Sequence, residues 1–184
     1  LKFIVTEDSL SSNAPHIETL HDHGLHYILG VKEGDHAHLF TQVQAAEHAG
    51  RVTYYERHDR AAGVTHRFRF VNDMPLNASN ADVRVNFIEY WEIGNRQTQH
   101  FSWVTDLRVS KRTVYRLMRG GRARWKIENE TFNTLKNQGY NFEHNYGHGE
   151  QHLSVVFAMV MMLAFLVDQT QQLCCALFRA VWTK

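Results

Sequence analysis

The sequence predicts an α/β fold in which a strand–helix–strand unit, a β-rich segment and a helical segment follow one another. Short apolar runs flank a helix-like stretch in residues 1–35, alternating apolar and polar residues fill much of 36–108, and helical patterns occupy 109–184. With 184 residues, 43% of them hydrophobic and 21% charged, the chain can bury a core of domain size. We therefore expect three successive regions with these bounds.

The first region is typical of two strands joined by a helix. The run "FIV" ends at the acidic pair Glu7-Asp8, and "SSNAPHIETL" supplies polar capping residues and an early proline, as at a helix start. Gly24 ends this helix, and "LHYILGVK" is rich in apolar and β-branched residues. Short connections between these elements predict a parallel, right-handed βαβ unit in a sheet covered by helices.

The second region predicts an antiparallel sheet that is exposed on one face. After a short helix-like stretch, "HLFTQVQAAEHAG", turn-prone stretches such as "DRAAG" separate segments that alternate apolar and polar residues. These segments are "RVTYYERH", "HRFRFVN", "VRVNFIEYWEI" and "HFSWVTDL".

The third region predicts helices. "SKRTVYRLMR" begins with a serine that can cap a helix, and we expect Gly120-Gly121 to end it. A second helix is expected over 122–138, because Gly139 supplies a stop. The apolar run at 155–167 is shorter than the roughly 20 residues that span a bilayer. We therefore expect a buried core helix there and no membrane partner.

Asp8 is the first candidate for chemistry. It follows a strand and precedes a helix, and open α/β sheets bind ligands beyond the carboxyl ends of their strands. Hard divalent cations prefer carboxylate oxygens. The alternative interpretation is an acid that caps a helix.

Glu128 is the second candidate. In "RARWKIENETFNTLK", the spacing of Trp125, Phe132 and Leu135 predicts one apolar, core-facing side of a helix, and Glu128 falls inside it. A buried carboxylate can be satisfied by a salt bridge, here to Arg124, by protonation or by a metal ion.

The segment 108–126 carries charge of one sign, although the net charge of the chain is only +1. Its basic residues are Arg108, Lys111, Arg112, Arg116, Arg119, Arg122, Arg124 and Lys126, with no acid among them. Such a folded segment favours contact with nucleic-acid phosphates, and the alternative is a basic surface without function. Tyr115 and Trp125 lie in the same segment and could stack on bases.

The chain has thirteen histidines, so a zinc-binding module is an alternative function, of a different class from nucleic-acid binding. The first set, His16, His21, His23 and His26, is spread over a helix end, a loop and a strand, and the second set, His144, His148 and His152, is interrupted by glycines. No HExxH or CxxC motif accompanies them. The only cysteines are the neighbours Cys174 and Cys175, which indicates a reducing, cytoplasmic compartment.

With these residues in view, the chain resembles the DDE-type transposases of bacterial insertion sequences, in the group with a YREK-like helix. The run from Arg122 to Lys136 is similar to their pattern RxRWxIExxxFxxLK, which places the third catalytic acid at Glu128. "FIVTEDSLSSNAPHIETLHDHGLHYILGVK" resembles the strand that carries the second acid and the helix and strand after it, which places that acid at Asp8. The resemblance covers nearly the whole chain.

The sequence departs from the family pattern at three points. Gly121 stands where a tyrosine is expected, and Lys136 lies eight residues after Glu128 instead of seven, where Leu135 stands. The first catalytic aspartate should lie on a strand upstream of residue 1. We therefore expect a carboxyl-terminal portion of a transposase that is inactive by itself.

The resemblance implies an RNase H-like core without its amino-terminal strands. Residues 1–35 would be its second part, 36–108 a β-rich insertion, and 109–184 a helical return with the catalytic helix at 122–138. It also implies metal-dependent phosphodiester cleavage and strand transfer at transposon ends, with two Mg²⁺ (or Mn²⁺) ions held by Asp8 and Glu128. An RNase H-like nuclease or a domesticated DNA-binding relative is the alternative.

The partners implied are the double-stranded terminal repeats and target DNA, with a homodimer as the active complex, in the bacterial cytoplasm on the nucleoid. The residues expected to contact DNA are Lys111, Arg112, Arg116, Arg119, Arg122, Arg124, Lys126 and Lys136.

Overall fold

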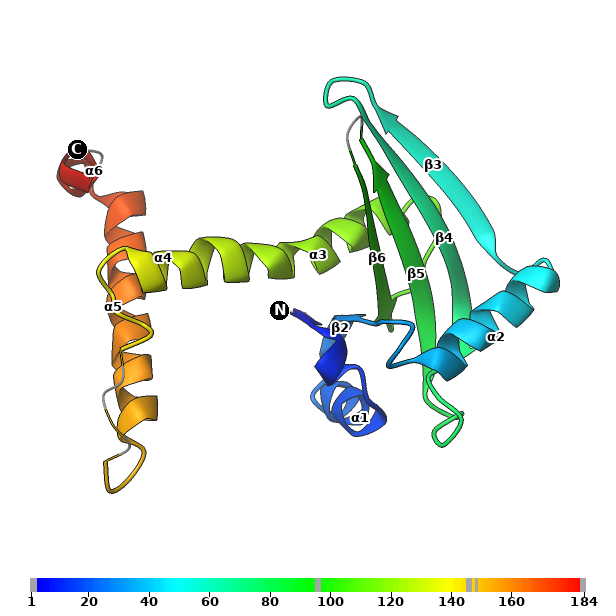
Figure 1. Cartoon of the computed structure of the whole chain (residues 1–184), viewed down its shortest axis with the longest axis horizontal. Helices are drawn as coiled ribbons and strands as arrows, with labels where there is room; N and C mark the ends of the chain where they lie inside the picture. The colour runs from blue at the N-terminus through cyan, green and yellow to red at the C-terminus, as the bar shows by residue number, and fades with distance from the viewer. Residues whose placement is uncertain (1–2, 95–96, 145–146, 148, 183–184) are drawn as a thin grey trace. The chain divides into compact units, whose positions relative to one another are not determined.

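The computed structural model describes residues 3–94, 97–144, 147 and 149–182. The chain forms two compact units, Leu1–Arg124 and Trp125–Lys184. All six strands lie in the first unit, and the second is helical (Figure 1). This mixed α/β architecture agrees with the predicted fold class.

The strands form one sheet in the order β1-β2-β6-β5-β4-β3. Their bounds are β1 Ile4–Glu7, β2 His26–Gly30, β3 Thr53–Asp59, β4 Val64–Pro75, β5 Arg84–Ile93 and β6 Thr98–Thr105. β1 and β2 are parallel and the other pairs antiparallel, as predicted for the βαβ unit and the β-rich segment. The two segments share one sheet because β6 pairs with β2, with Val104 opposite Leu29.

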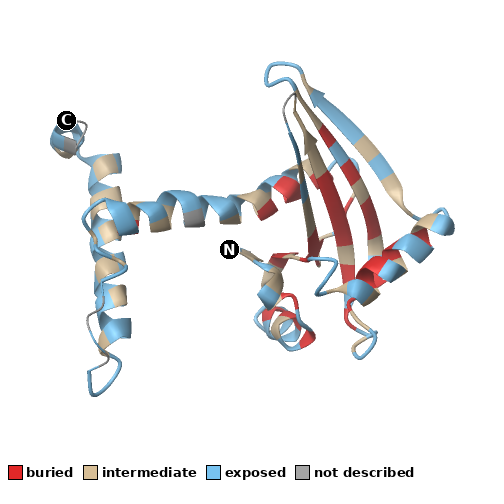
Figure 2. Cartoon of the chain, viewed as in Figure 1, coloured by how far each residue is buried: buried red, intermediate tan, exposed pale blue. Residues whose placement is uncertain are grey.

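Helices α1 (Ala14–Asp22) and α2 (Ala37–His48) cover one face of the sheet. Asn13 caps α1, and the sheet-facing residues of both helices are buried with those of the strands (Figure 2). This first core cluster includes Ile17, Leu20, Leu39, Val43, Phe87 and Val104. Between β1 and α1 lies the short 3₁₀ helix η1 (Ser9–Ser11).

Helix α3 (Val114–Lys126) packs its first part on the opposite face of the sheet. The second core cluster there contains Ile28, Phe68, Phe70, Ile88, Tyr90, Trp103, Val109, Val114, Leu117 and Met118. The alternation along the strands therefore supplies two cores, one on each face.

The predicted break at Gly120-Gly121 is wrong, because α3 runs through both glycines. A Cβ at Gly121 would lie 2.6 Å from the Trp103 indole, and one at Gly120 would lie 2.8 Å from Ile28 Cδ1. The glycines thus permit close approach of the helix to the sheet. They do not end the helix, which continues into the π-helical segment η2 (Ile127–Phe132) and α4 (Asn133–Asn137).

In the second unit, Leu135 is fully buried, as predicted, but Trp125 is 53% exposed and is not a core anchor. Phe132 is half-buried and stacks on Phe142, with ring centroids 5.6 Å apart. The predicted common face assumed α-helical spacing, and the wider π-helical turns of η2 change which residues share a side.

The prediction of a buried core helix at 155–167 is also wrong. That run lies in α5 (Leu153–Cys174), which has no buried residue in the described part of the chain and precedes α6 (Ala176–Trp182). Polar residues extend the apolar run, so that the helix has 22 residues and is long and apolar enough to cross a membrane by length and composition alone. An apolar helix of this kind is normally buried against another surface, and the composition alone does not identify that surface.

Candidate active site and nucleic-acid interface

The two acids at the end of β1 have different surroundings. Glu7 forms an ion pair with His16 of α1, with 2.6 Å between Oε2 and Nε2. Asp8 is exposed, and its Oδ1 accepts a hydrogen bond of 3.0 Å from the Leu10 amide at the start of η1. No salt bridge in the described part of the chain involves Asp8. Of this pair, Asp8 is therefore the acid that is open to a ligand.

The position of Asp8 follows from the parallel pairing of β1 with β2. Glu7 lies opposite Leu29, so both strands end at the same edge of the sheet, and Asp8 follows directly. The capping role that the sequence also allowed is real, because Asp8 is the N-cap of η1. One oxygen serves as the cap, and a carboxylate has further lone pairs for a second partner.

Glu128 lies in η2, and its side chain is outside the described residues. It belongs to the second compact unit and Asp8 to the first, so their approach stays a prediction. Short π-helical segments within α-helices are rare overall, and those that occur often lie at functional sites.

The basic residues around α3 divide by exposure. Arg116, Arg119 and Lys126 are exposed at helical spacing, on the side away from the buried Leu117, Met118 and Gly121. Lys111 and Arg112, and also Arg108, are exposed just before the helix begins. We call the exposed basic residues of the first unit the α3 basic stripe, namely Arg108, Lys111, Arg112, Arg116 and Arg119.

Two residues predicted to contact DNA, Arg122 and Lys136, interact with other side chains of the protein. The Arg122 guanidinium donates to Gln99 Oε1 at 3.1 Å and lies 4.1 Å above the centre of the Phe101 ring. Lys136 pairs with Glu143 at 2.6 Å, in an exposed position. Arg124 is half-buried.

The aromatic residues of the basic segment also differ. Trp125 is exposed and available for stacking, whereas Tyr115 is half-buried beneath Arg57, whose guanidinium lies 4.0 Å from its ring centre.

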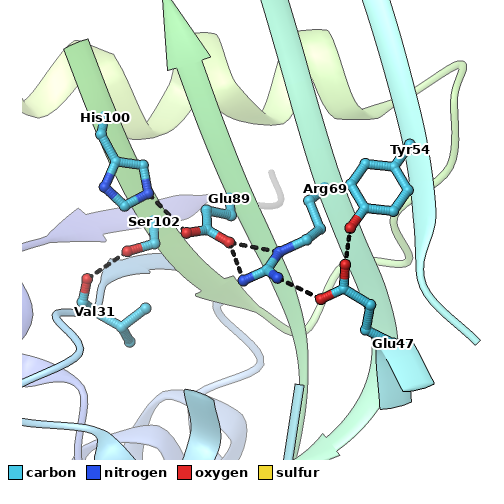
Figure 3. Close-up of polar contacts among 7 residues, drawn as sticks. All are labelled: Val31, Glu47, Tyr54, Arg69, Glu89, His100 and Ser102. Atoms are coloured by element: carbon cyan, nitrogen blue, oxygen red, sulfur yellow. Dashed lines mark hydrogen bonds and ion pairs between the residues drawn. The ribbon is translucent and has the colours of Figure 1, made fainter. Parts of the chain in front are cut away.

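A polar network on the α2 face of the sheet had not been expected from the sequence (Figure 3). Arg69 donates to Glu89 and, at 2.7 Å, to Glu47 of α2, and His100 lies 2.8 Å from the other Glu89 oxygen. The Tyr54 hydroxyl donates to Glu47. Burial disfavours the charged form of Arg69, but the facing carboxylates raise its pKa overall. The network joins α2 to the four neighbouring strands β3, β4, β5 and β6. Its signal in the sequence was charged residues at strand positions that face α2.

The first histidine set is dispersed among separate partners. His16 pairs with Glu7, His23 Nδ1 lies 2.7 Å from the Thr19 carbonyl oxygen, and His26 Nδ1 lies 2.5 Å from Asp106 Oδ2. In the second set, His148 is outside the described residues. Within the residues that the structure covers, no three His, Cys, Asp or Glu side chains gather in a group that could hold a metal ion.

The sequence matches a known protein family. The model of the transposase DDE domain matches residues 3–166, which is most of the chain and includes both candidate acids. No curated protein matches the sequence.

Proposed function

Because the chain belongs to the transposase DDE domain family, we propose that it carries two of the catalytic acids of an insertion-sequence transposase. This enzyme cleaves phosphodiester bonds at transposon ends and joins the ends to target DNA. The observation that carries the proposal is the family match together with the exposed Asp8 at the carboxyl edge of β1 and β2.

We propose an RNase H-like core, supported by the parallel β1–α1–β2 unit at residues 1–35. Residues 36–108 are its β-rich insertion, and 109–184 its helical return, which carries Glu128 in the π-helical segment η2.

The donor chemistry of Asp8 fits a hard divalent cation such as Mg²⁺ or Mn²⁺, because an exposed carboxylate has oxygen lone pairs beyond the one used by Leu10. Asp8 and Glu128 would hold two such ions. When bound, two ions activate the attacking oxygen and stabilise the leaving oxygen during displacement at phosphorus.

The reaction has two displacements. Water attacks the phosphorus at the transposon end and releases a 3′-hydroxyl, which then attacks target DNA. In both, the Leu10 amide holds one Asp8 oxygen, and the carboxylate keeps further lone pairs for a ligand. Two copies of the protein act together in the cytoplasm, on the two ends of one element.

The α3 basic stripe binds the DNA backbone, since cationic side chains that contact phosphates position the duplex without reading its sequence. Arg116→Ala should reduce the steepness of the salt dependence of binding by about 0.9, the value expected for one phosphate contact. Arg60→Ala in the β3–β4 turn is a matched control, since Arg60 is exposed and outside the stripe. Equal slopes for Arg116→Ala and the unmodified protein would remove Arg116 from the interface.

Substitution of the acids tests the catalytic proposal. In the full-length transposase with its cognate ends, Asp8→Asn and Glu128→Gln should abolish cleavage and retain DNA binding. Glu130→Gln is the control, because Glu130 is an exposed acid of the same π-helical segment. Retained cleavage in Glu128→Gln rules out the assignment. Cleavage without joined product in the unmodified enzyme identifies a nuclease instead.

A further inference from the structure

The loop that carries Asp8 is fastened to the end of β2 by one buried serine. Ser12 is only 5% exposed, and its hydroxyl donates to the carbonyl oxygen of Gly30, the last residue of β2, at 2.5 Å. A buried hydroxyl must find a partner, and here that partner lies 18 residues away in the chain. The bond closes the segment between β1 and α1 onto the neighbouring strand.

Gly30 lets this loop lie close to the strand. A Cβ at Gly30 would be 3.4 Å from the Ser9 nitrogen and 3.5 Å from the Asp8 carbonyl carbon. The backbone of Asp8 thus sits in contact with β2 where Gly30 has no side chain. These are van der Waals distances, so the loop backbone packs directly on the end of β2.

His36 holds Ser12 from the other side. Its Nε2 lies 3.0 Å from the Ser12 carbonyl oxygen, and a ring nitrogen that faces a carbonyl oxygen donates the hydrogen bond. His36 is the N-cap residue of α2, but its side chain makes no capping bond. It reaches the Asp8 loop instead, so Ser12 is held through its hydroxyl by β2 and through its carbonyl by the start of α2.

We propose that Ser12, held by Gly30 and His36, is a positioning residue that fixes Asp8 for metal binding, an inference that rests on the proposed function. Asp8 is exposed, and its carboxylate accepts a hydrogen bond from the Leu10 amide within the same loop. The placement of the loop on β2 therefore sets the placement of the carboxylate. Loss of partners that orient metal ligands typically costs about 10–100-fold in metal affinity or activity.

The test compares Ser12→Ala with Ser102→Ala in the full-length transposase. Ser102 is a close match, because its hydroxyl donates to the carbonyl oxygen of Val31, next to Gly30, at 2.8 Å (Figure 3). The readouts are the Kd for Mn²⁺ alone by calorimetry and the Mg²⁺ concentration for half-maximal cleavage. Ser12→Ala should raise both about 10-fold or more, with DNA binding unchanged, and Ser102→Ala should change neither.

Two variants of His36 test the same proposal if Ser12→Ala fails to fold. His36→Ala should weaken metal binding in the same direction, and His36→Gln, which retains an N–H donor, should restore it. Unchanged metal dependence in a folded Ser12→Ala, or an equal shift in Ser102→Ala, overturns the positioning role. Asp8→Asn is measured in parallel. If it cleaves, the proposed function fails and this inference with it; if it is inactive while Ser12→Ala binds metal normally, only the positioning role fails.

Discussion

The two compact units differ in how they bury their apolar side chains. In Leu1–Arg124, a core cluster lies on each face of the sheet, and in Trp125–Lys184 Leu135 is the one buried residue among those described (Figure 2). Large apolar side chains of α5 such as Met159 and Leu163 are more than half exposed.

The first unit is therefore stabilised by its own packing, whereas α5 of the second unit leaves its large apolar side chains exposed. Helical stability in proteins comes mostly from packing of an apolar face, so a helix that is apolar all round and unburied lacks its main support. The proposed acids are divided in the same way, because Asp8 lies in the self-supporting unit and Glu128 in the other. The predictions below test this contrast.

The largest effect is expected from Phe87→Ala in the first unit. Phe87 is fully buried and meets Phe40 of α2 edge-on, with ring centroids 5.2 Å apart. Removing it should lower the free energy of unfolding by about 3–5 kcal/mol, measured by urea denaturation, because it leaves a cavity between α2 and β5. Phe3→Ala is the control, since Phe3 is 60% exposed and should cost no more than about 0.5 kcal/mol. Similar losses in the two variants would contradict the core assignment.

A smaller loss is expected from Gly121→Ala, where α3 meets β6. In an open helix this change stabilises by about 1 kcal/mol, but here the new methyl group would lie 2.6 Å from Trp103. We expect a destabilisation of about 1–3 kcal/mol from overpacking, measured by thermal unfolding. Gly34→Ala, with nothing within 4 Å of the added Cβ, should not destabilise. If Trp103 is the cause, Gly121→Ala with Trp103→Leu should lose less than the sum of the single changes.

The sequence predicted the six strands, the first two helices and the parallel pair, because strand alternation and capping residues are local signals. The pairing of β2 with β6 is not local: Leu29 and Val104 are far apart in the chain, and each strand pattern would fit several partners. The glycines of α3 were misinterpreted for the same reason, since only the distant Trp103 shows that they permit contact.

For the candidate site, the sequence predicted Asp8 from its place after a strand. The sequence could not show that Glu7 pairs with His16 or that Ser12 forms a hydrogen bond with Gly30. Both contacts depend on how α1 and β2 lie beside β1. The exposure of Trp125 depends on the π-helical turns that follow it, which an α-helical period does not contain.

The free energy of unfolding of the first unit should also depend on pH, with a smaller change than the two substitutions above produce. His66 is 8% exposed, and burial lowers its pKa, partly offset by the Glu92 and Asp59 carboxylates, while Arg57 lowers it further. The unfolded chain therefore binds a proton more readily, so His66 contributes stability that is present above its unfolded pKa of about 6.5 and is lost as the pH falls. The free energy of unfolding should decrease from pH 8 to pH 5, and His66→Gln should flatten that decrease. An unchanged slope in His66→Gln would exclude His66 as its source.

The smallest effect is expected from Leu163→Ser in α5. Leu163 is 59% exposed, so the change removes little buried apolar surface and should cost no more than about 0.5 kcal/mol in urea denaturation. Leu135→Ala, at the fully buried position of the same unit, is the matched comparison and should cost about 2–5 kcal/mol. A loss above about 1 kcal/mol for Leu163→Ser would show that α5 is covered in solution, because an exposed leucine has no such burial to lose. A loss of that size would mean that apolar side chains are packed in both units. A loss below about 0.5 kcal/mol would mean that only the first unit packs its apolar side chains in this way.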